Sequence, residues 1–219
     1  MGESSIMVGV AKLAITPPFG CEMSGFIARR GGAAGVHDPL WAKALVISDG
    51  REKVALVVAD LIGIDSEIVS EVRALTSRLT DIPAGHVILG ATHTHSGPAV
   101  LRHAYLGKAD PAYLACLIKN LAGSVFLASQ ALEPVRVLVG QGECGGVGKN
   151  RRKPGGPTDP EVLVLRFEGK TGIKALLVNY ACHPVVLGPD NLLISADYPF
   201  YLASLLEQVY PGAQIMFVN

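Results

Sequence analysis

Short apolar runs bounded by turn residues recur along the chain and predict β-strands. Residues 42–48 and 53–59 are two such runs, and Asp49-Gly50 between them is a common hairpin turn. The second run is apolar at odd and even positions alike, which is typical of a strand covered on both faces. Further strands are predicted at residues 86–91, 135–140, 161–167, 173–181 and 214–219.

Three other segments repeat apolar residues at the spacing of a helix. The first follows Asp65 and Ser66, which can cap it, and the third follows Asp197. The clearest helix follows Pro111 and is predicted to be ended by Pro134. The apolar stripes are Ile68, Val69, Val72, Leu75 and Leu79 in the first helix, Leu114, Leu117, Ile118, Leu121, Val125 and Ala128 in the second, and Tyr201, Leu202, Leu205 and Val209 in the third.

This mixture of strands and helices predicts an α/β fold with a layered mixed β-sheet core and flanking helices. No linker, internal repeat or low-complexity tract divides residues 1–219, so we expect a single domain. The last predicted strand stops together with the chain, and a domain rarely ends on a core strand with no turn behind it. We therefore expect the domain to be incomplete.

The composition narrows the class of function. Hydrophobic residues make up 49% of the chain and charged residues 17%, which leaves material for a large core. Nineteen basic and nineteen acidic residues cancel, so no long-range attraction to nucleic acid is expected. No uninterrupted apolar segment approaches the roughly 18 residues of a membrane span. The N-terminal residues lack the order of a signal peptide, and the four cysteines form no CxxC pair, so we expect a cytoplasmic protein with reduced thiols.

Two histidines at the end of a predicted strand are the strongest chemical signal. His93 and His95 follow the apolar run 86–91, and Ser96-Gly97-Pro98 breaks the strand after them. Residues i and i+2 of a strand point to the same face, so both imidazoles can address one point in space, as a metal site requires. An HxH pattern also occurs by chance, but its position at the carboxyl end of a strand favours a site.

His183 ends another apolar strand, directly before Pro184. A ligand from a distant strand is what a catalytic zinc centre needs, with one position left for water. By itself His183 also fits a core histidine that a backbone carbonyl satisfies. Two strand-end histidine elements in one chain favour the metal hypothesis. Asp60 and Asp197 each fit a capped turn or helix as well as a carboxylate that orients a metal-bound histidine.

Other kinds of site do not fit the sequence. Cys182 and His183 are adjacent, so on a strand they face opposite sides and cannot form a nucleophile–base pair. Gly148-Lys149 resembles the end of a phosphate loop, but Glu143 stands where that motif needs glycine. Neither HExxH nor GxSxG occurs in the chain.

A longer motif surrounds His93 and His95, because residues 91–98 read Ala-Thr-His-Thr-His-Ser-Gly-Pro. This octapeptide resembles the signature of a known family, the neutral (non-lysosomal) ceramidases, in its bacterial branch. The resemblance runs from about residue 8 to residue 219. Further elements occur in the family's order at residues 8–11, 15–17, 35–40, 59–60, 150–151, 182–184 and 194–197.

The resemblance implies a zinc-dependent amidohydrolase that splits an N-acyl compound, lipid or otherwise. His93 and His183 match two zinc ligands of the family, His95 matches a histidine that contacts substrate or the reacting water, and Arg151 matches an arginine that lines the site. The remaining family elements, a Gly-Asp-x-Ser/Asn-Pro segment and the glutamate and tyrosine ligands, come after the position of Asn219. We therefore expect this segment to be inactive by itself.

Two other functions remain compatible with these residues. The domain could be catalytically dead and bind a ligand or act as a scaffold. Alternatively, it could keep the zinc and cleave another bond, for example that of an ester.

Overall fold

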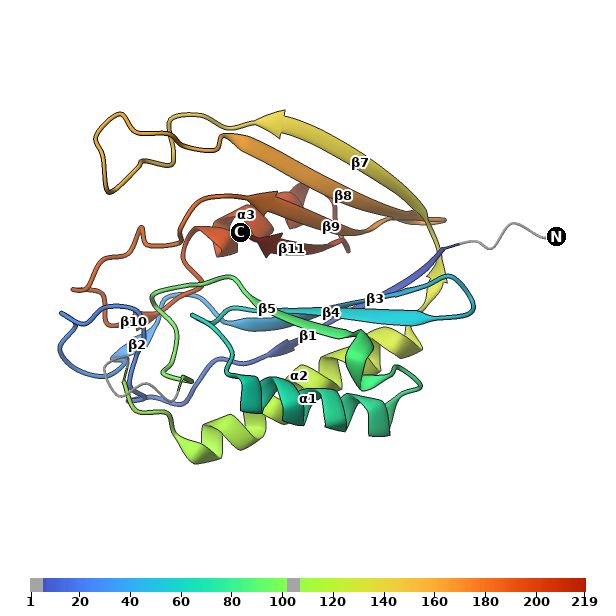
Figure 1. Cartoon of the computed structure of the whole chain (residues 1–219), viewed down its shortest axis with the longest axis horizontal. Coiled ribbons are helices and arrows are strands. Elements are labelled where there is room, and N and C mark those ends of the chain that lie inside the picture. The colour runs from blue at the N-terminus through green and yellow to red at the C-terminus, as the bar shows by residue number, and fades with distance from the viewer. Residues whose placement is uncertain (1–5, 102–106) are drawn as a thin grey trace.

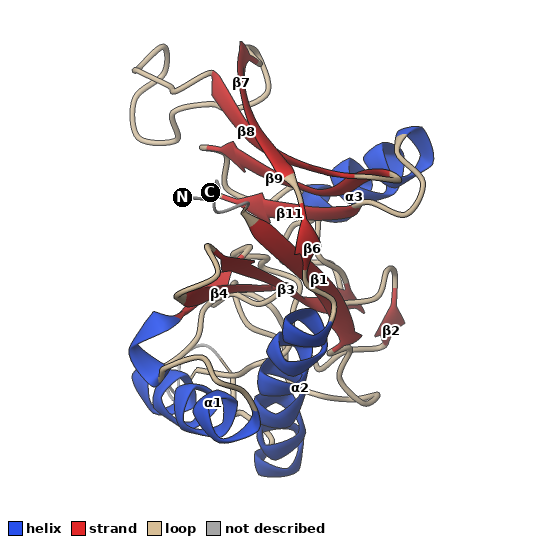
Figure 2. Ribbon diagram, turned by 90° about the vertical axis from the view of Figure 1, so that its right-hand side faces the viewer, coloured by secondary structure: helices blue, strands red, loops and turns tan. Residues whose placement is uncertain are grey.

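The computed structural model describes residues 6–101 and 107–219, which form four stacked layers (Figure 1). Two larger β-sheets lie face to face in the middle. Helices α1 (Ser66–Leu79) and α2 (Pro111–Gln130) cover the outer face of one sheet, and α3 (Tyr198–Val209) packs on the outer face of the other (Figure 2). The predicted layered α/β fold with a mixed sheet core is confirmed.

The first sheet has the order β5-β4-β3-β1-β6. Its strands are β1 (Met7–Ala14), β3 (Trp41–Ser48), β4 (Lys53–Ala59), β5 (Val87–Ala91) and β6 (Glu133–Pro134). β3 pairs antiparallel with β1 and β4, whereas β5 runs parallel to β4. Asp49 holds the turn between β3 and β4, because its Oδ1 accepts the backbone N–H groups of Arg51 and Glu52 at 2.8 Å each.

The second sheet has the order β11-β9-β8-β7. Its strands are β7 (Arg136–Glu143), β8 (Glu161–Gly169), β9 (Gly172–Tyr180) and β11 (Gln214–Val218). β9 and β11 are parallel, and α3 is the crossover that such a pair requires. A short parallel pair, β2 (Gly35–Val36) with β10 (Leu193–Ile194), lies apart from both sheets, and a 3₁₀ turn, η1 (Ala84–His86), leads into β5.

Alternate residues of the central strands face different layers, as the period of two in a strand requires. In β3, Ala42, Ala44 and Val46 belong to the core beneath α1 and α2, whereas Leu45 faces the second sheet. The helix side is built from small residues, so α2 lies close to β1: a Cβ added to Gly9 would stand 2.0 Å from the carbonyl oxygen of Ala128.

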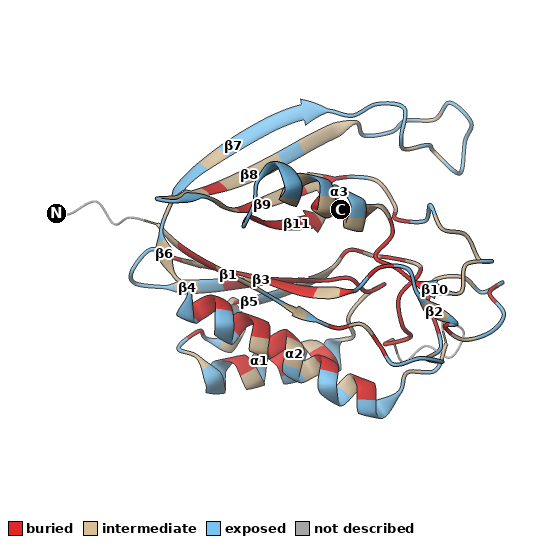
Figure 3. Ribbon diagram, turned by 180° about the vertical axis from the view of Figure 1, so that it is seen from behind, coloured by how far each residue is buried: buried red, intermediate tan, exposed pale blue. Residues whose placement is uncertain are grey.

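The space between the two sheets is filled by larger apolar side chains. Buried residues of the first sheet meet buried residues of the second; they are Val8, Leu45 and Val58 from one side and Phe167, Ala175 and Met216 from the other. The inner strands are buried while much of β7 is exposed (Figure 3). Contacts between side chains across this space therefore hold the two sheets together.

The buried side of α3 differs from the prediction. Leu202, Ala203 and Leu206 pack on the second sheet, whereas the predicted stripe residues Tyr201, Leu205 and Val209 are exposed, Leu205 to 62%. The helix carries apolar residues on both sides, so spacing by itself could not select the side that is buried. The predicted stripe of α2 is confirmed, with Leu117, Leu121, Val125 and Ala128 buried.

α2 is long and apolar enough, by length and composition only, to cross a membrane. Core helices of water-exposed domains pass the same test, and α2 buries one side against β1 and β3. It ends at Gln130, before Pro134, because Glu133 and Pro134 pair with β1 instead. β1 itself was not predicted as a strand, since glycine, alanine and lysine at positions 9, 11 and 12 weaken its strand pattern.

Replacement of Phe167 by alanine tests the packing between the sheets. Phe167 is 1% exposed, so Phe167→Ala leaves a cavity there and is expected to lower the free energy of unfolding by about 3–5 kcal/mol. Phe19→Ala makes the same chemical change at a side chain that is 84% exposed, and should change stability by less than about 0.5 kcal/mol. Urea unfolding of both variants measures the difference. Equal effects would contradict the assigned core.

Candidate metal centre

Three histidines from two different sheets meet at one end of the molecule. β5 and β9 run toward the same end, and the segments that follow them, residues 92–98 and 181–184, carry the three side chains (Figure 1). These segments touch each other directly, because the N–H of His95 donates to the carbonyl oxygen of Pro184 at 3.4 Å. His93, His95 and His183 thus offer nitrogen atoms that lie within 4.8 Å of one another.

The route by which His93 and His95 converge differs from the prediction. β5 ends at Ala91, so neither histidine lies on the strand, and strand alternation does not orient them. Instead His93 adopts a left-handed backbone conformation, with φ of 66°, which costs a residue other than glycine of order 1–3 kcal/mol. With this backbone, the rings of His93 and His95 lie in contact, with their centroids 5.1 Å apart.

His93 is held in one tautomer by its surroundings. Its backbone N–H donates to the carbonyl oxygen of Leu61 at 2.9 Å, and its Nδ1 lies 2.6 Å from the carbonyl oxygen of Ile62. A carbonyl oxygen only accepts, so Nδ1 of the neutral ring carries the proton and Nε2 is left with a free lone pair. This is the arrangement in which a histidine binds a metal through Nε2.

The three rings are in mutual contact. The ring centroids of His93 and His183 are 4.8 Å apart and nearly stacked, and His95 stands edge-on to both, at 5.1 Å from His93 and 4.6 Å from His183. The Nε2 atoms of His95 and His183 are separated by 2.8 Å. At this distance the two nitrogen atoms form a hydrogen bond, in which the N–H of one ring donates to the lone pair of the other.

The electrostatics favour neutral imidazoles. Burial lowers the pKa of His95 to about 4, and the neighbouring His183 and His93 add to this shift. The pKa of His183 is also lowered, first by burial and then by His93 and Arg151. Neutral imidazole is the form that binds a metal, so the cluster is suited chemically to a metal cation. Among the described residues, no carboxylate belongs to this cluster.

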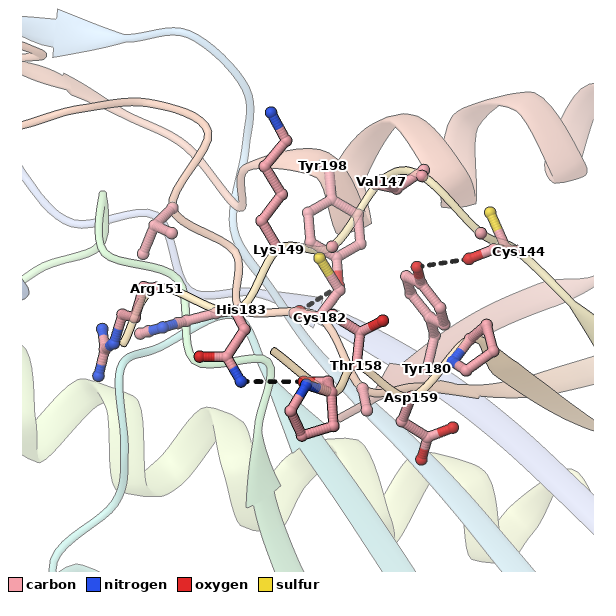
Figure 4. Close-up of a pocket in the computed structure, with 18 of the residues that line it drawn as sticks. Cys144, Val147, Lys149, Arg151, Thr158, Asp159, Tyr180, Cys182, His183 and Tyr198 are labelled. Atoms are coloured by element: carbon pink, nitrogen blue, oxygen red, sulfur yellow. Dashed lines mark hydrogen bonds between the residues drawn. The ribbon is translucent and has the colours of Figure 1, made fainter. Parts of the chain in front are cut away.

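A pocket of about 720 Å³ opens beside His183 (Figure 4). It lies between the loop that joins β7 to β8 and the segment after β9, and Tyr198 of α3 closes one side. Apolar side chains of Val147, Val185 and Val186 contribute to its wall. The hydroxyl of Tyr198 donates a hydrogen bond to the carbonyl oxygen of Cys182. This bond connects α3 to the segment that carries His183.

Arg151 lies at the His183 end of this pocket. Figure 4 shows its guanidinium group beside the His183 ring, while Lys149 extends away. Asn150 shapes the loop: its Oδ1 accepts the N–H groups of Arg152 and Lys153, and its Nδ2 donates to the carbonyl oxygen of Pro157. Among the described residues Arg151 forms no ion pair, so its charge is available to a ligand.

The two ambiguous aspartates have structural contacts. Asp60 is buried at the end of β4, where its Oδ2 accepts the N–H of Trp41 at 2.9 Å. Asp197 caps α3 by accepting the N–H of Tyr198, and its other oxygen accepts the N–H of Leu187 at 2.9 Å. Asp197 therefore also anchors the segment that follows His183. Neither carboxylate forms a hydrogen bond to the three histidines in the described structure.

Comparison with known proteins places the chain in a family. Residues 6–217 match the family model of the neutral/alkaline non-lysosomal ceramidases, N-terminal. The chain belongs to this ceramidase family. Among curated relatives, it is 27% identical to a neutral ceramidase of Pseudomonas aeruginosa over 203 residues, which cover 82% of this chain and 30% of that protein. It is 26% identical to a neutral ceramidase of Mycobacterium tuberculosis over 223 residues, 90% of this chain and 34% of that protein.

Solved ceramidase structures share the fold. The crystal structure of the neutral ceramidase from Pseudomonas aeruginosa superposes with a TM-score of 0.88 at 24% identity, covering 99% of this chain and 38% of that one. A ceramidase complexed with C2 gives a TM-score of 0.84, also at 24% identity, over 97% of this chain and 37% of that one. The chain spans about a third of the length of the curated relatives it matches.

The structure adds residues that sequence reasoning missed. Gly25, Phe26 and Arg29 lie against His95. They fall in a glycine-rich stretch without strand or helix periodicity, where adjacent Arg29 and Arg30 look equivalent. One is buried and the other exposed, and no feature of the sequence distinguishes them.

Substitution of Asp60 tests its structural role through pH. Burial raises the pKa of Asp60 above its ordinary value of 3.8, so the folded protein holds this proton at a pH where the unfolded chain has lost it. The contribution to stability is thus present below 3.8 and is lost as the pH rises through the folded pKa. Asp60→Asn keeps an oxygen for the N–H of Trp41 and removes this dependence.

The free energy of unfolding, measured from acid to neutral pH, should therefore fall less steeply with rising pH in Asp60→Asn than in the native protein. Asp190→Asn, at an exposed position, is the matched control and should keep the native slope. A native slope in Asp60→Asn as well would mean that the buried carboxyl does not titrate as described.

Proposed function

We propose that the chain forms part of the catalytic domain of a zinc-dependent hydrolase that cleaves the amide bond of an N-acylated lipid such as a ceramide. The observation that carries this proposal is the meeting of His93, His95 and His183 within 4.8 Å at one end of a ceramidase fold. Membership of the ceramidase family and similarity to neutral ceramidases of two bacteria support the choice of bond.

The donor set fits zinc. Zinc accepts imidazole nitrogen, and its catalytic sites keep a position free of protein ligands. In this proposal His93 and His183 hold the ion through nitrogen, with the proton of His93 Nδ1 fixed by the carbonyl oxygen of Ile62. A bound zinc ion supplies Lewis-acid chemistry, polarising the substrate carbonyl and acidifying a water molecule.

The remaining groups would act on the substrate. His95 stands with its Nε2 at hydrogen-bond distance from that of His183, and a neutral imidazole in this place can accept a proton or hydrogen-bond the reacting groups. Arg151 lies beside His183 at the end of the pocket, where a guanidinium can bind an oxygen that carries developing negative charge. The apolar wall formed by Val147, Val185 and Val186 suits the hydrocarbon part of such a substrate.

Metal analysis together with hydrolysis tests the proposal. The chain is expected to bind zinc weakly, because it supplies only His93 and His183, whereas a longer natural form that carries the remaining ligands is expected to bind about one zinc ion per molecule. A form that carries the full ligand set is expected to cleave a fluorescent N-acyl-sphingosine. His93→Ala and His183→Ala should remove both properties, whereas His86→Ala, whose ring contacts the carbonyl oxygen of Lys53 away from the cluster, should remove neither.

Each departure from that result has a meaning. Zinc binding with an intact ceramide and cleavage of an ester would assign another bond to the same centre. Zinc binding without cleavage of either would favour a ligand-binding domain. Absence of any metal from the longest natural form would contradict the hydrolase proposal.

Arg151→Gln tests the contact of Arg151 with substrate. Loss of a charge-assisted hydrogen bond, worth about 1.5–3 kcal/mol, should lower kcat/KM for the N-acyl substrate by about 10- to 100-fold. The stoichiometry of zinc should stay unchanged. Arg152→Gln removes the neighbouring charge outside the pocket and should leave kcat/KM within about twofold of the native value, as expected for an exposed side chain. Equal effects of the two variants would place Arg151 outside the reaction.

A further inference from the structure

The segment from Glu22 to Arg30 runs alongside the loop that carries His95. The N–H of Ser24 donates to the carbonyl oxygen of Gly97 at 3.0 Å, and the N–H of Ala99 donates to that of Glu22 at 2.7 Å. An antiparallel bridge joins Met23 to Pro98. The two segments are therefore paired through their backbones directly next to His95.

Arg29 is buried and forms hydrogen bonds with the backbone of three loops. Its guanidinium donates to three backbone carbonyl oxygens, those of Ser24 at 2.8 Å, His95 at 2.7 Å and Asn191 at 3.1 Å. The side chain is 8% exposed, and within the described residues no carboxylate pairs with it. Burial of an unpaired charge is costly, and hydrogen bonds offset the cost only where the backbone stays in place.

Two neighbours of Arg29 contact the His95 side chain itself. Gly25 has φ of +115°, and a Cβ at this position would stand 2.6 Å from both the Cα and the Cβ of His95. The ring of Phe26 stands edge-on to the His95 ring, with centroids 5.0 Å apart. The guanidinium of Arg29 lies over this same Phe26 ring, 5.1 Å from its centroid. We call Gly25, Phe26 and Arg29 the His95 clamp.

We propose that the His95 clamp positions His95, and that Arg29 is its positioning residue. Arg29 fixes the backbone of His95, Gly25 allows the close approach, and Phe26 limits rotation of the ring. Together they determine where Nε2 of His95 stands relative to His183. The task of His95 beside the proposed metal ligand His183 rests on the function proposed above, whereas the placement of His95 by the clamp does not.

Arg29→Met keeps an unbranched apolar stem and removes the five N–H donors of the guanidinium. The carbonyl oxygen of His95 loses its partner, so the ring is expected to leave the 2.8 Å contact with His183. Long-range ¹H–¹⁵N spectra of the metal-free protein, which report each imidazole separately, should show shifted and broadened His95 signals and unchanged His86 signals. Arg30→Met, at the exposed neighbouring arginine, should leave all signals in place. Arg29→Lys, which keeps a donor, should shift them less than Arg29→Met.

Titration with Co²⁺ as a spectroscopic substitute measures the effect on the metal centre. Nε2 of His95 lies 2.8 Å from Nε2 of His183, which is a proposed metal ligand, so displacement of His95 removes a neighbour that orients this ligand. Loss of a group that orients a ligand histidine typically weakens metal affinity by about 10- to 100-fold, and we expect a loss of this order for Arg29→Met. The same substitution in a His95→Ala background should then cause no further loss, because the clamp acts through His95. Gly25→Ala tests the clamp by a second route and should reproduce the spectral change of Arg29→Met.

Circular dichroism and thermal unfolding show which variants are folded. Where Arg29→Met does not fold, the spectra of Gly25→Ala test the placement of His95 instead. Native His95 signals in a folded Arg29→Met or Gly25→Ala variant would overturn the proposal. So would an undiminished effect of Arg29→Met on cobalt affinity in the His95→Ala background. If Co²⁺ binds to no form of the protein, the proposed metal function fails, and the imidazole spectra alone decide on the clamp.

Discussion

The distance between the two halves of the candidate site depends on the packing of one β-sheet on the other. His93 and His95 follow a strand of the first sheet, and His183 follows a strand of the second. No hydrogen-bond ladder joins these strands. The packing of Leu45 with Phe167 and Met216 therefore holds the two sheets at a fixed distance from each other. A close-packed interior does not deform continuously, which is why it can hold side chains of two layers at a fixed separation.

Local pattern was sufficient to predict most elements, because burial on both faces leaves long apolar runs and helices keep their period. It failed where two sides were equally apolar, as in α3, and where a strand carries small or charged residues, as in β1. The division into two sheets was beyond the sequence, since strand pairing across many residues leaves no local signature. The convergence of His93, His95 and His183 could be predicted because each follows a predicted strand, although the left-handed backbone of His93 could not. Their roles as metal ligands or as a catalytic group stay predictions.

The clamp shows a different limit of sequence reasoning. Arg29 and Arg30 are chemically identical neighbours, and only the tertiary structure buries one of them beneath three carbonyl oxygens. Such a residue contributes in a way that resembles a short piece of secondary structure, because it satisfies backbone groups that have no strand or helix partner. The loops at this end of the molecule have few regular backbone bonds, so side chains such as Arg29, Asn191 and Asp197 replace them.

The left-handed backbone of His93 has a consequence for how an ion would enter the protein. Folding of the chain compensates the backbone strain at His93, and the carbonyl oxygen of Ile62 orients the His93 ring independently of an ion. An ion that binds here therefore docks onto a finished scaffold, unlike the ion of a zinc finger, whose arrival folds the peptide. Under the proposed metal binding, chelation is therefore expected to remove the ion without unfolding the protein.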